Sequence, residues 1–485
     1  MNKEYLINQR PLKALLVFAF PIMIGNLFQQ FYTMADSVVV GRFVGEDALA
    51  AVGASYSLTN VFISIAIGGG IGSSVVTSRL FGSRDYTKMK RSISTALLTF
   101  LGLSILLGAF GLWQSSAIML FLNTPSNIMG QAAEYLNIYF LGLPFLFMYN
   151  VLSSMFNALG RSRIPLYLLI FSSVFNILLD IYMVYSLDLG VAGVAWATLI
   201  AQGISAITAF ILFLRELKAY PAAPTVPYGK EELKAMTRIA LPSILQQSTV
   251  SIGMMLVQSV VNNFGSEILA GYSAAMRVEA LCFVPMAAMG NAMSPYTAQN
   301  IGARRFDRVQ KGYHTAYGIV AVFAVLLCLT LQLFYRPIIT MFLGEGGSAL
   351  ALDTGIRCLR FMGWFYALIG LKMITDGLLR GAGDMKMFTV ANLVNLGIRV
   401  CFAAAMAPLF GISMVRLAVP IGWTANYLIS YMEYGEMEKA ASEGIGFPDI
   451  KTNTLEGFCL PNVPVPTYTS FNHSCIHDTG LIPGF

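Results

Sequence analysis

Apolar runs long enough to cross a lipid bilayer dominate this sequence. A membrane-spanning helix needs about 20 predominantly apolar residues, and such runs recur from residue 13 to residue 432 with short interruptions. Only 12% of the residues are charged, against about 25% in a soluble domain. The pattern predicts an all-α polytopic membrane protein whose function is performed by the helices themselves.

Polar breaks divide the apolar region into about twelve predicted spans. Their limits are 13–41, 48–79, 92–114, 131–159, 164–186, 191–214, 236–263, 268–301, 313–343, 354–379, 386–408 and 411–432. Lys and Arg cluster in every second connection, and basic connections stay in the cytoplasm. We therefore expect both termini to be cytoplasmic. The net charge of +6 then reflects topology, and no nucleic-acid partner is expected.

The two halves of the apolar region resemble each other. FGSRDYTKMKRS at 81–92 corresponds to IGARRFDRVQKG at 301–312, and Pro21 in AFPIM matches Pro242 in ALPSI. Because each half has an even number of spans, both enter the membrane from the same side. The repeat is therefore parallel, with its axis along the membrane normal, as in several secondary transporters.

This repeat predicts two pseudo-symmetric six-helix bundles around a central cleft. We assign residues 1–214 to the first bundle, 215–235 to a cytoplasmic linker and 236–432 to the second bundle. Residues 433–485 lose helical periodicity after their first part and collect Pro, Gly, Thr and Asn. Such a composition is typical of disordered chain, and we interpret this segment as an atypical tail.

Acidic and polar side chains share one depth in the first bundle. Asp36 lies in the outer third of the first helix, Asn176 and Asp180 are one turn apart in the fifth, and Thr198 of the sixth lies at the same height. An acid in hydrocarbon costs roughly 2.5–3.5 kcal/mol on insertion scales. Two neighbouring carboxylates there should share a proton or bracket a cation. We predict a cation-binding site for H⁺ or Na⁺, and Gln29 could line the same cavity.

The second bundle differs at the matching positions. Arg399 stands where the fifth helix of the first bundle has its acid, and the seventh helix has Gln246 but no acid. We place cation coupling in the first bundle and keep Gln29, Gln246, Glu279 and Arg399 as candidates for the substrate cleft. Lys372 and Asp376, one turn apart, are expected to neutralise each other. No metal site or cofactor is expected.

Three stretches carry a resemblance to a known family. PIMIGNLFQQFYTMADSVVVGRFVG, ALGRSRIPL followed by NILLD, and LRGAGDMK followed by NLVNLGIRV occur at the proper places among the twelve helices. Over roughly residues 5–432 the chain resembles a bacterial member of the multidrug and toxic compound extrusion (MATE) family. Asp36, Asn176, Asp180 and Thr198 match the cation site of the family's N-terminal bundle.

The resemblance implies a secondary active transporter that works by alternating access. It would exchange cationic or amphipathic organic compounds for H⁺ or Na⁺ across the bacterial plasma membrane, and we expect a monomer. A lipid-linked saccharide flippase of the same superfamily is an alternative. An enzyme is not expected, because the sequence has no HExxH, GxSxG or Walker A motif.

Overall fold

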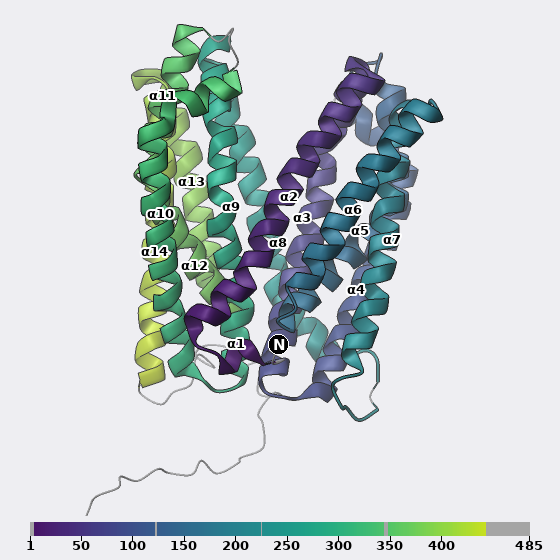
Figure 1. The fold of residues 1–485 in the computed structure, drawn as a ribbon, viewed down its shortest axis with the longest axis vertical. Coiled ribbons are helices and arrows are strands. Elements are labelled where there is room, and N and C mark those ends of the chain that lie inside the picture. Colours follow the sequence, from purple (N-terminus) through teal and green to yellow (C-terminus); the bar gives the residue numbers. More distant parts are fainter. Residues whose placement is uncertain (1–3, 122–123, 225, 344–347, 443–485) are drawn as a thin grey trace, which may run out of the picture. The chain divides into compact units, whose positions relative to one another are not determined.

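Long helices make up nearly all of the described chain (Figure 1). The computed structural model describes residues 4–121, 124–224, 226–343 and 348–442. The first half contains α1 (Tyr5–Asn8), α2 (Pro11–Val39), η1 (Val40–Val44), α3 (Glu46–Gly82), α4 (Tyr86–Phe121), α5 (Met129–Ala158), α6 (Arg163–Ile181), η2 (Tyr182–Ser186) and α7 (Gly190–Leu217). The second half contains α8 (Lys230–Asn262), α9 (Ser266–Gly302), α10 (Phe306–Leu343), α11 (Ala349–Gly363), α12 (Tyr366–Ala382), α13 (Met385–Phe410) and α14 (Ser413–Ser442).

Most of these helices are long and apolar enough to cross a membrane. Ten of the described helices qualify by length and composition, and the pair α11 and α12, bent by 54°, forms an eleventh candidate. The sequence predicted one span at 354–379, and the structure divides this region into α11 and α12, with a break after Gly363 that the sequence did not predict. A glycine inside a helix weakens it, and the break falls directly after this one.

Two predicted boundaries also differ from the structure. The connection between the halves is shorter than 215–235, because α8 already begins at Lys230. Glu231 and Glu232 lie in its first turn, where acidic side chains stabilise the helix dipole. At the other end, α14 continues past 432 to Ser442, through residues such as Glu and Lys that form helices well. The rest of the predicted tail, 443–485, lies outside the described residues.

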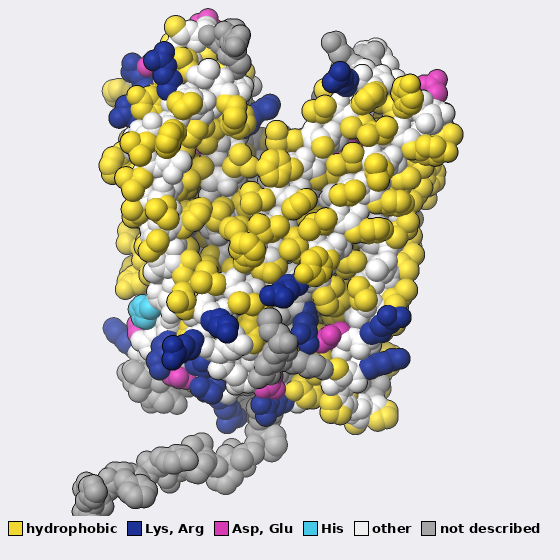
Figure 2. Space-filling view, viewed as in Figure 1, with side chains coloured by type: hydrophobic (Ala, Val, Ile, Leu, Met, Phe, Trp, Pro, Cys, Tyr) yellow, Lys and Arg dark blue, Asp and Glu magenta, His cyan; other side chains and the backbone are white. Residues whose placement is uncertain are grey.

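The helices pack as two groups. Helices α2 to α7 contact one another, as do α8 to α14. The groups meet through their first two long helices, since α3 packs on α8 and α9 and α2 packs on α9. Figure 2 shows hydrophobic side chains over the middle of this unit and Lys and Arg gathered at the end where α1 lies, which we call the basic end. At the opposite end the unit is hollowed between the two groups (Figure 2).

A reciprocal glycine contact at the basic end displays the internal repeat. A Cβ atom on Gly82 of α3 would lie 2.0 Å from the carbonyl oxygen of Gln299 in α9. A Cβ atom on Gly302 of α9 would likewise lie 2.0 Å from the carbonyl oxygen of Arg79 in α3. Gly82 and Gly302 occupy equivalent positions in the two repeats, as do Arg79 and Gln299, so the two contacts are equivalent. The two helices therefore cross with their backbones touching, which only glycine permits.

The short helix α1 joins the two groups at the basic end. Burial raises the pKa of the Tyr5 phenol, so the hydroxyl stays protonated and donates to the carbonyl oxygen of Gly160 at 2.9 Å. On the other side, the carbonyl oxygen of Leu6 accepts from Asn300 Nδ2 at 3.2 Å and from Arg308 at 3.3 Å. One turn of helix thus contacts both halves of the repeat.

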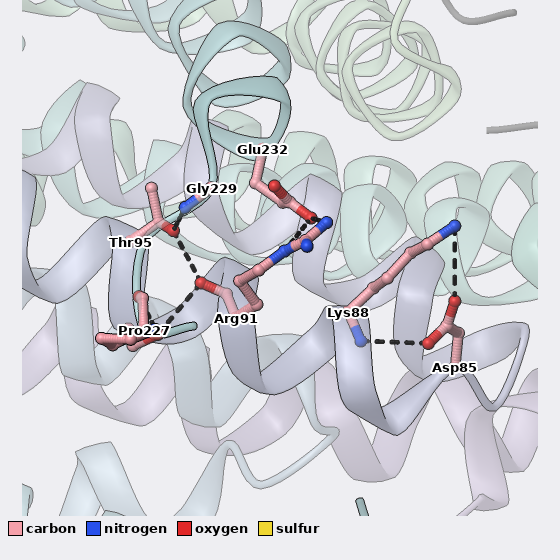
Figure 3. Close-up of polar contacts among 8 residues, drawn as sticks. Asp85, Lys88, Arg91, Thr95, Pro227, Gly229 and Glu232 are labelled. Atoms are coloured by element: carbon pink, nitrogen blue, oxygen red, sulfur yellow. Dashed lines mark hydrogen bonds and ion pairs between the residues drawn. The ribbon is translucent and has the colours of Figure 1, made fainter. Parts of the chain in front are cut away.

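The connection before α8 is held against α4 (Figure 3). The backbone N–H of Gly229 donates to Thr95 Oγ1 at 3.0 Å. Next to it, Arg91 Nε donates to Glu232 Oε1 at 2.7 Å, and Glu232 is fully buried. These bonds attach the start of the second half to the first.

Candidate functional site

The two acids predicted from the sequence lie side by side. Helix α2 packs along α6, and the carboxyl groups of Asp36 and Asp180 are hydrogen-bonding neighbours. Asp180 is fully buried and Asp36 is half-buried. In the described part of the chain, Oδ1 of each acid is buried without a hydrogen-bond partner. Two neighbouring acids with such unpartnered oxygens can hold a shared proton or a small cation.

The amide of Asn176 links the acids to α7. The hydrogen-bond network favours the amide orientation in which Nδ2 donates to the Tyr32 hydroxyl at 2.9 Å and to Asp180 Oδ2 at 3.0 Å. Oδ1 of Asn176 then accepts from the backbone N–H of Thr198 at 3.0 Å. The structure therefore brings together all four residues predicted for the cation site.

Tyrosines that the sequence analysis did not name complete the surroundings. Tyr32 lies one turn before Asp36 on the same face of α2, a spacing that could have indicated it. Tyr135 of α5 is an electrostatic neighbour of both acids. Together with Tyr139, Thr198 and Gln202, Tyr135 lines a pocket between α5 and α7. Nothing in the spacing of α5 marks Tyr135, because its place depends on how α5 packs.

Each acid is followed by a π-helical turn. The turn η1 begins one helical turn after Asp36, and η2 begins two residues after Asp180. Such turns often mark functional sites. They bring valines of both segments into one buried apolar cluster, which consists of Val40, Ala48, Val184, Val191 and Val194. This cluster lies just beyond the acid pair.

Gln29 is not brought to the acid pair. It lies about 10 Å before Asp36 along α2, at 1.5 Å per residue, and its side chain is exposed. The structure therefore separates Gln29 from the four residues around the acid pair. Its assignment to the substrate cleft stays a prediction.

A second pocket lies between α8 and α13. Gln246 of α8 and Asn395 and Arg399 of α13 line it, so two of the predicted cleft residues share one pocket. Glu279 of α9 does not line it but is an electrostatic neighbour of Arg399. Among the described residues no ion pair within 4.0 Å joins Arg399 to an acid.

The predicted Lys372–Asp376 pair is confirmed. Lys372 Nζ lies 2.8 Å from Asp376 Oδ2, with both side chains almost fully buried. Asn392 of α13 bridges them, because its Oδ1 accepts from Lys372 at 3.0 Å and its Nδ2 donates to Asp376 at 3.4 Å. Both charges are thus neutralised within α12 and α13.

These features define a class of protein. The chain is a multi-pass membrane protein of twelve helices in two pseudo-symmetric six-helix bundles, and both bundles contain a pocket lined in part by polar side chains. A family model described as MatE matches residues 21–182 and 242–405, one match in each half. The chain therefore belongs to the MATE family of membrane transporters.

Relatives and solved structures agree with this assignment. The chain is 29% identical to a probable multidrug resistance protein, YpnP, of Bacillus subtilis, over 87% of this chain and 94% of that protein. It is 22% identical to a FAD transporter of Shewanella oneidensis, over 84% and 91%. It also matches the outward-facing structure of a multidrug resistance MATE family transporter, with a TM-score of 0.83 at 24% identity, over 92% and 99% of the two chains. The flippase alternative is not favoured.

Proposed function

We propose that this protein exports cationic or amphipathic organic compounds in exchange for H⁺ or Na⁺ that binds at Asp36 and Asp180. The observation that carries the proposal is the pair of neighbouring carboxyl groups, each with a buried oxygen that lacks a partner within the described residues. The names of relatives, a multidrug resistance protein and a FAD transporter, support organic cargo.

Coupling follows from the electrostatics of the pair. Two like charges about 4 Å apart repel by about 4 kcal/mol at an effective dielectric constant of 20. A bound proton or Na⁺ removes this repulsion and attracts both acids, so the loaded site holds α2 against α6. When no cation is bound, both acids are charged, and their repulsion favours separation of α2 from α6 or entry of water between the two acids. A cation shifts the transport equilibrium only because it binds one of these arrangements better.

The arrangement in the membrane follows from the distribution of charge. On the face that Figure 2 shows, Lys and Arg gather at the basic end, and several also lie at the opposite end. By the positive-inside rule, we place this end and both termini in the cytoplasm of a bacterial cell, with the protein acting as a monomer in the plasma membrane.

Efflux measured in vesicles under separate pH and Na⁺ gradients tests the proposal. The wild type should expel a fluorescent organic cation when one of these gradients is imposed, and that gradient identifies the coupling ion. Asp36→Asn keeps the shape of the side chain but removes its charge. This variant should still bind the dye and should lose efflux driven by the gradient.

The matched control is Asp188→Asn. Asp188 is an exposed acid in the connection between η2 and α7, so the same chemical change there should leave coupled efflux unchanged. Undiminished coupled efflux in Asp36→Asn would remove the acid pair from the mechanism. Failure of the wild type to move organic cations under either gradient would overturn the proposed exchange itself.

A further inference from the structure

The pocket between α8 and α13 is the counterpart, in the second bundle, of the acid site in the first. When the repeats are aligned through Pro21 and Pro242, Gly253 of α8 stands where α2 has Tyr32, and Val257 where α2 has Asp36. On the other wall, Arg399 of α13 stands where α6 has its second acid. The two bundles thus place opposite charges at equivalent positions.

The walls of this pocket differ from the matching part of the first bundle. Tyr32 reaches Asn176 across the first bundle, whereas Gly253 lines the pocket together with Leu396 of α13, whose Cδ1 would lie 2.5 Å from a Cβ atom on Gly253. Gly422 of α14 supports the far wall, because a Cβ atom there would lie 2.4 Å from Asn395 Oδ1 and 2.8 Å from Arg399 Cγ. The stem of Arg399 therefore packs against α14.

Although Glu279 of α9 is an electrostatic neighbour, Arg399 makes no direct ion pair within the described residues. Its Nε atom is buried without a hydrogen-bond acceptor, and no acidic oxygen of the described chain lies within 4.0 Å. Asp376, the acid of the neighbouring α12, is already paired with Lys372 at 2.8 Å. Arg399 is partly exposed, and an arginine within a membrane-spanning helix is costly unless an anion or water accompanies it.

We propose that this pocket binds a carboxylate carried by the transported compound, with Arg399 as the recognising cation. The inference rests on the proposed export function and names a class of cargo for it: amphipathic molecules that carry a carboxylate. The guanidinium fork matches a carboxylate in two parallel hydrogen bonds. Amide groups of Gln246 and Asn395 on the two walls can turn to donate to the same group.

Glu279 supplies an internal check on this proposal. As an electrostatic neighbour of Arg399, a charged Glu279 competes with a carboxylate for the same cation. Removing its charge should therefore strengthen binding of a carboxylate, whereas an ion pair that only stabilises the fold would not produce this gain.

A pair of dyes that differ only at one carboxyl group tests the proposal. Rhodamine 110 has a free carboxylate, and rhodamine 123 is its methyl ester. Dissociation constants are measured by fluorescence anisotropy with the purified full chain in detergent. Arg399→Gln should weaken binding of rhodamine 110 about ten-fold, as expected for loss of a charged hydrogen bond, and should change rhodamine 123 by less than about two-fold on the same scale.

Three further variants complete the experiment. Arg399→Lys should retain part of the preference for rhodamine 110, and Glu279→Gln should increase it. Arg336→Gln, which removes an exposed arginine of α10, is the matched control and should leave both dissociation constants unchanged. If Arg399→Gln does not fold, Arg399→Lys and Glu279→Gln still measure the dependence on charge.

The outcomes are distinct. If Arg399→Gln weakened binding of both dyes equally, so that the ratio of their dissociation constants stayed unchanged, the carboxylate site would be overturned. The same holds if the wild type did not bind rhodamine 110. The anisotropy measurement needs no ion gradient, so it remains readable when coupled efflux fails. Loss of coupled efflux with an intact dye preference would count against the proposed exchange and not against the carboxylate site.

Discussion

Replacing Arg91 by glutamine should destabilise the folded protein through the acid that it leaves behind. Glu232 is fully buried, one of its oxygens accepts from Arg91 Nε at 2.7 Å, and the other has no partner among the described residues. Breaking a buried pair by removing one member costs about 3–5 kcal/mol. Because 31% of the Arg91 side chain is exposed, we expect a loss at the lower end of this range, about 3 kcal/mol.

Equilibrium unfolding in mixed micelles, followed by tryptophan fluorescence, measures these free energies. Lys88→Gln is the matched control, since Lys88 lies one turn before Arg91 on α4 and pairs with Asp85 at 3.7 Å while partly exposed (Figure 3). Loss of such a pair should cost less than about 1 kcal/mol. The double variant Arg91→Gln with Glu232→Gln should regain most of the loss. A loss in Arg91→Gln that is no larger than the control, or that the double variant does not regain, would refute the reasoning.

Two further predictions concern the second bundle and the contact between bundles. Gly82→Val would place a Cβ atom 2.0 Å from the carbonyl oxygen of Gln299, so α3 and α9 should no longer pack closely at the basic end. Labelling of cysteines introduced near this contact, with a reagent added from that side, should therefore increase. Unchanged labelling would contradict the prediction. Lys372→Met leaves Asp376 as an unpaired buried charge and should lower the free energy of unfolding by about 3–5 kcal/mol. Adding Asp376→Leu should restore most of that loss, and equal losses in the single and double variants would contradict the prediction.

The helices and the repeat could be predicted from the sequence because they depend on local and periodic features. Span lengths follow from the thickness of the bilayer, and matched segments one repeat apart reveal the duplication. Depth also follows, since a helix rises 1.5 Å per residue. That rise placed Asp36 and Asp180 at one level, and the structure puts their carboxyl groups in contact.

The rotation of each helix about its axis and the choice of lateral neighbours required the tertiary structure. Tyr135 became a neighbour of the acid pair because α5 packs against α7. The break after Gly363 left no clear signal, since the apolar run continues through it.

The clearest division concerns charge in the second bundle. By itself, the sequence determined that an arginine replaces an acid at position 399, because the repeats align there. It could not determine whether that arginine is paired, because pairing depends on distances between side chains of different helices. Only the packing of α8, α13 and α14 decided that Lys372 is neutralised while the guanidinium of Arg399 faces a pocket.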